Sequence, residues 1–233
     1  FTLKNGFVNS IVRKTIGIWQ LSFLNFCIAS IQVGFGPFLG IFLLSKGWDT
    51  SAIGIVMTFG GIAGMLMTAF AGVLIDSTTR KRVYVAVAGV CVILASSAIL
   101  VSQNFLVVAS SQVATAIAGA IIDPAIIGIT LGIVYQQGFN RQNGLNQAYN
   151  HAGNMVGAGL SGYLGIRYGL SGVFSLSIAF GVLSIIFVLL IPAASINDKV
   201  ARGLPESKGN YEKISGISLL YKNRNILILA ICL

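Results

Sequence analysis

The sequence carries very little charge for its length. Only 9% of its 233 residues are Asp, Glu, Lys or Arg, whereas 55% are hydrophobic, and the mean hydropathy is +0.87. A soluble domain would have about a quarter of its residues charged, and several uncharged runs here exceed the roughly 20 residues that a helix needs to cross a bilayer. This composition excludes an ordinary soluble domain and predicts an integral membrane protein.

Cysteine is also scarce. Cys27, Cys91 and Cys232 all lie inside apolar runs, which predicts small buried side chains and neither a disulfide framework nor a metal site. No stretch resembles a nucleotide-binding loop, so we expect neither ATP nor another cofactor. The net charge of +9 comes from cations between apolar runs. Because a nucleic-acid surface interleaves cations with aromatic and polar residues, we expect no nucleic acid as partner.

The apolar runs themselves are long, continuous and rich in Leu, Ile, Ala and Gly. This favours helices over the short alternating segments of a membrane barrel, and we predict an all-α polytopic bundle with six transmembrane helices and the start of a seventh. The runs cover 15–44, 50–75, 82–103, 105–135, 141–167 and 170–194, and the seventh begins at "NILILAICL". The predicted organisation is a six-helix domain over 1–195, a cytoplasmic linker over 196–222, and the beginning of a C-terminal half over 223–233.

Orientation follows from the Lys and Arg residues of alternate connections, since cytoplasmic loops are enriched in these cations. Thirteen cations lie on one side and only two, Lys46 and Arg167, on the other. The larger set comprises Lys4, Arg13, Lys14, Arg80, Lys81, Arg82, Arg141, Lys199, Arg202, Lys208, Lys213, Lys222 and Arg224. The predicted N-terminus is therefore cytoplasmic.

The second run ends in "GVLIDSTTRKR", from Gly72 to Arg82. This stretch resembles the loop between the second and third helices of major facilitator superfamily transporters, with the pattern G-x-x-x-D-[RK]-x-G-[RK]-[RK]. Gly72, Asp76, Arg80 and Lys81 match, whereas Ser77 and Thr79 depart from it. Gly72 and Asp76 also continue a helix face through Thr68, Gly64 and Gly60, and small residues at this spacing permit close helix packing.

The resemblance implies the N-terminal half of a twelve-helix secondary transporter that works by alternating access. A small molecule would bind between this half and the protein's own C-terminal half, in a cell membrane that is expected to be a bacterial inner membrane. The resemblance also implies a gating role for Asp76 and Arg80, and no enzymatic activity. The alternative is a generic cationic loop that only sets the orientation.

The fifth run contains "GNMVGAGLSG", which is similar to a G-x-x-x-G-P-x-x-G-G pattern of antiporters in this superfamily. Ala158 replaces its proline and Ser161 its first paired glycine. We therefore expect proton-coupled efflux, with proton-coupled uptake as the alternative. Gly153, Gly157, Ser161, Gly165 and Gly169 step by four, which predicts a close-packed seam.

Asp123 is the only acidic residue deep inside a run, and ionisable groups at such depth are costly and usually functional. The adjacent Pro124 favours a helix break at this point. If the fourth and fifth runs form a hairpin with its tip near Gly138, then Asp123 and His151, the single histidine, lie at similar depth. We predict that both take part in proton coupling or in binding a polar substrate, the alternative being hydrogen bonds to neighbouring helices or water.

Several amides complete the predicted site. Asn150 and Asn154 belong to a polar stripe on the fifth run, and Asn25 and Gln32 share a face of the first. Each could bind substrate or only hydrogen-bond between helices. Pro37, which ends "GFGP", predicts a broken helix and a hinge.

Two other classes of protein compete with a transporter. "GLSG", from Gly159 to Gly162, has the G-x-S-G form of rhomboid-type intramembrane proteases, with Ser161 as nucleophile and His151 as base. Ten residues along one helix separate these two side chains by about 15 Å, far beyond the reach of proton abstraction. A non-transporting receptor or assembly subunit is the second rival, which the polar residues at mid-depth disfavour.

Overall fold

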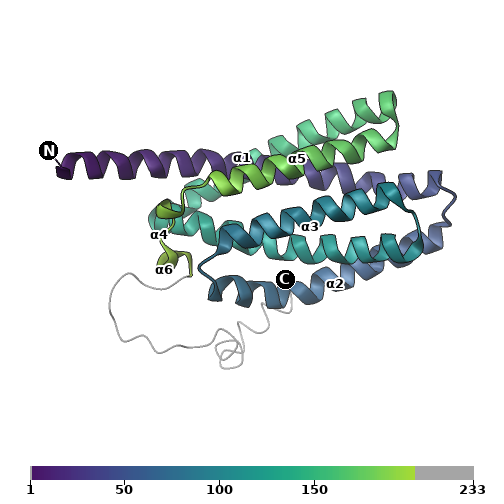
Figure 1. Cartoon of the computed structure of the whole chain (residues 1–233), viewed down its shortest axis with the longest axis horizontal. Helices are drawn as coiled ribbons and strands as arrows, with labels where there is room; N and C mark the ends of the chain where they lie inside the picture. Colours follow the sequence, from purple (N-terminus) through teal and green to yellow (C-terminus); the bar gives the residue numbers. More distant parts are fainter. Residues whose placement is uncertain (1, 203–233) are drawn as a thin grey trace.

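A computed structural model describes residues 2–202, apart from the side chains of residues 2–11, 13 and 33–37. All regular elements in this range are helical (Figure 1). The elements are α1 (Thr2–Ser45), α2 (Thr50–Ser77), α3 (Lys81–Val101), α4 (Phe105–Tyr168), α5 (Leu170–Leu190), the 3-10 turn η1 (Ala193–Ser195) and α6 (Asp198–Ala201). Most of the predicted linker and the predicted seventh helix lie outside the described residues.

Helix α4 is a hairpin, although its 64 residues are continuous in hydrogen bonding. Tyr135 has φ 61° and ψ 176°, a conformation that bulky side chains rarely adopt. The Asn146 amide donates to Thr130 Oγ1 at 3.1 Å, whereas sixteen residues of straight helix would span about 24 Å. The limb before Tyr135 (105–134, the first limb) and the limb after it (136–168, the second limb) therefore lie side by side.

The hairpin agrees with the predicted pairing of the fourth and fifth runs, and the reversal falls at Tyr135, three residues before Gly138. Buried amides hold the limbs together and to α1. Gln142 Nε2 donates to Asn146 Oδ1 at 2.9 Å and to Ser22 Oγ at 3.3 Å. Because an unsatisfied buried amide is costly, this network fixes the register of the two limbs against α1.

Two prolines do not break their helices as predicted. Helix α1 continues through Pro37, and the first limb continues through Pro124 with helical backbone angles. A proline removes one backbone donor, but a helix packed against neighbours can tolerate that loss. The backbone reversal is supplied instead by Tyr135.

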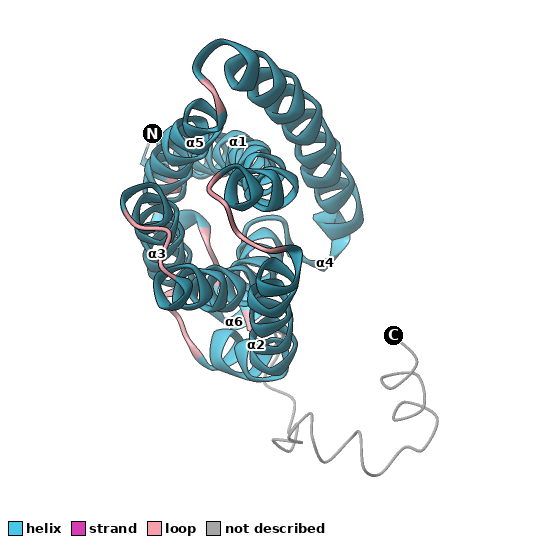
Figure 2. Ribbon diagram, turned by 90° about the vertical axis from the view of Figure 1, so that its right-hand side faces the viewer, coloured by secondary structure: helices cyan, strands magenta, loops and turns pink. Residues whose placement is uncertain are grey.

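The helices run roughly parallel or antiparallel around a common axis, as the end-on view of Figure 2 shows. The larger apolar core joins α1, α3, the first limb and α5, with Leu21, Leu24, Ile129 and Val188 at its centre. A smaller core surrounds Phe42 and Phe174, near the opposite end of α1. Helix α1 thus contributes to both cores.

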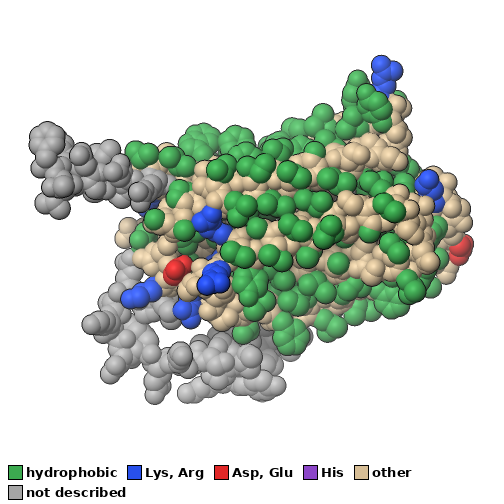
Figure 3. Space-filling model, viewed as in Figure 1, with side chains coloured by type: hydrophobic (Ala, Val, Ile, Leu, Met, Phe, Trp, Pro, Cys, Tyr) green, Lys and Arg blue, Asp and Glu red, His purple; other side chains and the backbone are tan. Residues whose placement is uncertain are grey.

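Four helices of the described range, α2, α3, α4 and α5, are long and apolar enough to cross a membrane. In Figure 3, hydrophobic side chains cover the visible middle of the bundle, and Lys and Arg side chains gather towards its ends. An apolar outer band with charged ends is what a bilayer requires. The predicted helical membrane bundle is confirmed at this level.

Candidate functional site

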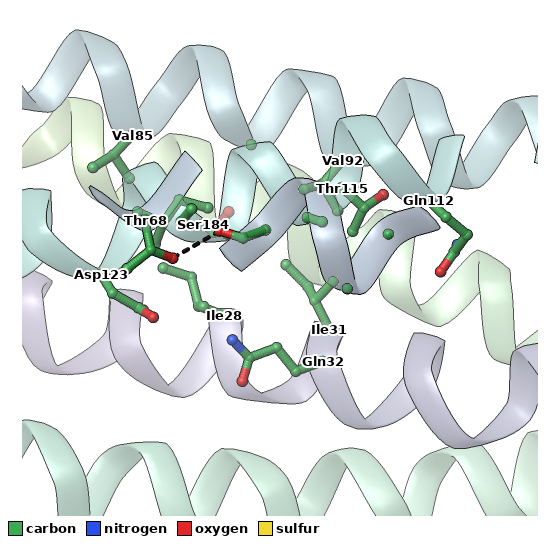
Figure 4. Close-up of a pocket in the computed structure, with 18 of the residues that line it drawn as sticks. Ile28, Ile31, Gln32, Thr68, Val85, Val92, Gln112, Thr115, Asp123 and Ser184 are labelled. Atoms are coloured by element: carbon green, nitrogen blue, oxygen red, sulfur yellow. Dashed lines mark hydrogen bonds between the residues drawn. The ribbon is translucent and has the colours of Figure 1, made fainter. Parts of the chain in front are cut away.

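A cavity of about 520 Å³ lies between α1, α2, α3, the first limb of α4 and α5. Most of its wall is apolar or glycine. Its polar side chains are Gln32, Thr68, Gln112, Thr115, Asp123 and Ser184. In the view of Figure 4, Asp123 and Thr68 lie towards one end, Gln112 and Thr115 towards the other, and Gln32 between them. No Lys or Arg is among the described residues that line the cavity, so its ionisable group is a carboxylate.

Glycines of α2 allow this helix to pack closely against the first limb of α4, and they also line the cavity. A methyl group added at Gly60 would lie 3.3 Å from Gln112 Cβ, and one added at Gly64 would lie 3.4 Å from Ala116 Cβ. Both glycines also line the cavity. The close packing predicted for this face of α2 is therefore present against the first limb, whereas an added methyl at Gly72 would meet nothing within 4 Å.

Asp123 projects from the first limb into this cavity and is solvent-accessible there. No hydrogen bond or ion pair within the described range involves its carboxylate. An unpaired carboxylate in a membrane-spanning segment is unfavourable unless it faces water, a proton or a ligand. Asp123 is thus placed to bind a proton or a positively charged group.

Of the other predicted site residues, the structure brings Gln32 to the same cavity but not His151. Gln32 is exposed on α1 and lines the cavity. Asn25 is buried and donates to Leu21 O at 2.8 Å within α1. Asn154 donates to Asn150 Oδ1 at 3.3 Å on the second limb, and His151 is exposed on that limb.

The second limb presents a polar face to the outside of the bundle. His151 and Gln147 are exposed, and Asn150 and Asn154 are half-buried. Polar side chains are costly against lipid, so this face is suited to a protein surface or an aqueous cavity. Gln147 was absent from the predicted site, although it lies four residues before His151 on the same face.

Sequence reasoning also missed Gln112 and Thr115 as cavity residues. Together with Gly119 and Asp123 they recur every three or four residues along the first limb, which places them on one helix face. Gln112 Nε2 is buried and has no hydrogen-bond partner among the described residues. Counting back from Asp123 in steps of three or four residues would have predicted that Gln112 and Thr115 share its helix face.

In the α2–α3 connection, the buried cation is Lys81 and not Arg80. The Lys81 side chain is 3% exposed, and its ammonium group donates to Ile75 O and, at 3.2 Å, to Thr78 O. Arg80 and Asp76 are both exposed. Because the last carbonyl groups of a helix attract cations, Lys81 closes the C-terminal end of α2.

We expect Lys81→Ala to lower the free energy of unfolding by about 1.5 to 3 kcal/mol, the usual contribution of a charged hydrogen bond. Arg80→Ala is the matched control, since Arg80 makes no side-chain capping bond, and exposed substitutions usually change stability by less than about 0.5 kcal/mol. Thermal unfolding in detergent measures both. Equal stability of the two variants would contradict the structural role of Lys81.

The seam predicted on the fifth run is present in part, between the second limb and α1, whereas Gly165 meets only Val173 of α5 at 3.6 Å and Gly169 meets nothing within 4 Å. A methyl group added at Gly153 would overlap the carbonyl oxygen of Phe26, and one at Gly157 would lie 2.9 Å from Ser30 Cα. Ser30 Oγ donates to Gly153 O at 3.0 Å. Ser161 continues the seam and is fully buried, so a protease nucleophile at this position would be out of reach of a substrate.

Comparisons with known proteins agree with this architecture. The family model of the Major Facilitator Superfamily matches residues 21–233. Two curated relatives, described as uncharacterized MFS-type transporters of Mycobacterium tuberculosis strains CDC 1551 and H37Rv, are each 36% identical over 210 residues. The match covers 89% of this chain and 50% of each relative, so the chain spans about half their length.

Proposed function

Since the chain belongs to the major facilitator superfamily, a family of membrane transporters, we propose that it forms one half of a secondary active transporter. In this proposal a small molecule binds between residues 1–195 and a second six-helix half, and the two halves expose it to each side of the membrane in turn. Transporters built from such repeats place their substrate near the bilayer midplane, at the interface between repeats.

The six crossings of this half are α1, α2, α3, the first and second limbs of α4, and α5. Each limb of α4 exceeds the roughly 20 residues that a crossing requires, and the Asn146 to Thr130 bond supports their antiparallel arrangement. The connections that hold Arg80, Lys81 and Lys199 share one end of the bundle, and we propose that this end and the N-terminus are cytoplasmic in a bacterial inner membrane.

The observation that carries the transport proposal is Asp123, an unpaired carboxylate lining a cavity within an apolar bundle. The polar face of the second limb, with Asn150, His151 and Asn154, supplies a second surface directed away from this half. We propose that a second six-helix half covers this face and that these side chains, with Gln32 and Asp123, bind substrate or protons. Asn25, whose amide is used within α1, would contribute through helix packing.

We propose protons as the coupling ion, since a carboxylate in such surroundings can alternate between charged and neutral forms. Efflux is the favoured direction because of the glycine pattern from Gly153 to Gly162, and uptake by symport is the alternative. Asp76, Arg80 and Lys81, with Gly72, would stabilise one access state from the cytoplasmic end. Lys81, bound to the end of α2, is well placed to transmit movement of this helix.

The test is transport by the natural full-length protein in proteoliposomes, over a panel of labelled cations, zwitterions and neutral molecules. We expect at least one compound to accumulate against its gradient only when a proton gradient is imposed. The orientation of the proton gradient that drives accumulation distinguishes efflux from uptake. No accumulation of any compound under either gradient would favour the receptor or assembly-subunit alternative.

A further inference from the structure

A second cavity, of about 340 Å³, lies where the start of α3 meets the end of α5. Among the described residues, its wall contains three consecutive cations and a single carboxylate, a net charge of +2 (three less one). The charged residues are Arg80, Lys81, Arg82 and Asp198. In Figure 3, blue side chains surround a red one at the left end of the bundle, next to the apolar surface. This basic cavity is separate from the cavity that holds Asp123.

Hydrogen bonds to backbone carbonyl groups fix two of the cations of this cavity. Arg82 Nε donates to Val188 O at 3.1 Å, and Arg82 Nη2 donates to Leu189 O, which joins the start of α3 to the end of α5. Lys81 is held by Ile75 O and Thr78 O. These bonds use carbonyl oxygens, which carry no full negative charge, so the cations keep their excess positive charge.

Lys81 is a cation of the wall that makes no ion pair among the described residues. Its side chain is 3% exposed, and its ammonium group donates to two backbone carbonyl oxygens, while Asp76 and Asp198 act on it only through space. Buried charges in proteins are usually paired. Arg80 is exposed beside it and makes no side-chain capping bond, so its guanidinium is available to a ligand.

The apolar part of the wall indicates what kind of anion fits. Val83 and Leu189 line the cavity and are 51% and 52% exposed. Val87 continues from Val83 along α3, and Leu190 follows Leu189 on α5, both also exposed. Because α3 and α5 are long and apolar enough to cross a membrane, these side chains extend from the cavity over the lipid-facing surface.

We propose that this basic cavity binds the headgroup of an anionic phospholipid, with the phosphate near Arg80 and Arg82 and an acyl chain along Val83 and Leu189. Basic pockets between transmembrane helices on the cytoplasmic side are suited to anionic lipid headgroups. The proposal does not depend on the substrate or on the direction of transport. It assigns a ligand to the cations that follow Asp76.

The experiment measures binding of a short-chain, fluorescently labelled phosphatidylglycerol to the purified full-length protein in detergent, with labelled phosphatidylcholine for comparison. We expect phosphatidylglycerol to bind more tightly by about thirtyfold, which corresponds to roughly two cations at about fivefold each. Arg80→Gln should weaken binding of phosphatidylglycerol by about fivefold, since one cation near a lipid headgroup contributes about 1 kcal/mol. Asp198→Asn should strengthen it, because the substitution removes the carboxylate of the cavity.

Arg167→Gln is the matched control, because Arg167 is exposed in the last turn of α4, away from the basic cavity. It should leave phosphatidylglycerol binding unchanged. Equal binding by Arg80→Gln and the natural protein, or equal affinity for the two lipids, would overturn the proposal. Complete displacement of the lipid by millimolar inorganic phosphate would also overturn it, since the ligand would then be a free anion.

Discussion

Gly153→Ala is expected to destabilise the bundle by about 3 kcal/mol, the upper range for overpacking a tight contact. The added methyl group would overlap the carbonyl oxygen of Phe26, and backbone atoms cannot rotate away as a side chain can. Helix α1 and the second limb would have to separate, which also weakens the bond from Ser30 Oγ to Gly153 O. Thermal unfolding in detergent should show a midpoint lower by roughly 6 to 12 °C.

Gly159→Ala on the same limb is the control for this prediction. A methyl group at Gly159 would meet nothing within 4 Å, and alanine is a better helix former than glycine by about 1 kcal/mol. This variant should therefore be as stable as the natural protein or slightly more so. Changes in stability of opposite sign for the two substitutions would identify the contact with α1 as the cause of the destabilisation. Equal stability of the two variants would show that this contact relaxes without cost.

The helices were largely predictable because a bilayer imposes its thickness on the sequence. Five of the six apolar runs agree with a helix or a limb of α4 to within about five residues at both ends, from Thr50 to Leu190, whereas α1 begins at Thr2 and not near residue 15. The hairpin of α4 was predicted, but its reversal at Tyr135 was not. Glycine is the usual residue at positive φ, so residue type gave no sign that Tyr135 would hold the reversal.

Helix packing was predictable where small residues recur on one face. Gly153 and Gly157 contact α1 as their spacing predicts, but spacing alone did not show which helix they meet or that Gly72 meets none. Prolines were the weaker signal. Neither Pro37 nor Pro124 ends its helix, because surrounding helices can compensate for one missing backbone donor.

The candidate site was only partly predictable, since equal depth does not imply the same face. Asp123 and His151 lie on different limbs of α4, and only Asp123 lines the cavity within this half. The direction in which each side chain points depends on how its limb is rotated about its own axis. The Asn146 hydrogen bond and the Gly153 seam fix that rotation. In the α2–α3 connection, the motif identified the cations but not that Lys81 is buried and Arg80 exposed.

Asp123→Asn is expected to abolish proton-driven accumulation of the transported compound by the full-length protein. Asparagine keeps the size and polarity of the side chain but cannot release or take up a proton. Asp123 is the only carboxylate that lines the cavity among the described residues, with no cation beside it. If it carries the coupling proton, the initial rate under a proton gradient should fall by at least about tenfold, a loss of about 1.4 kcal/mol or more, while movement down the compound's own gradient continues.

Two further variants make this result specific. Asp123→Glu keeps an ionisable carboxylate and should retain part of the coupling. Asp49→Asn also removes a carboxylate, but from the exposed N-cap of α2, where Asp49 accepts a hydrogen bond from Ser51 N at 3.1 Å. Because asparagine caps helices equally well, transport should not change in this variant. Rates are compared in proteoliposomes with and without an imposed pH difference. Unchanged coupling and affinity in Asp123→Asn would remove this carboxylate from the mechanism and leave the polar face of the second limb as the place to search for the proton site.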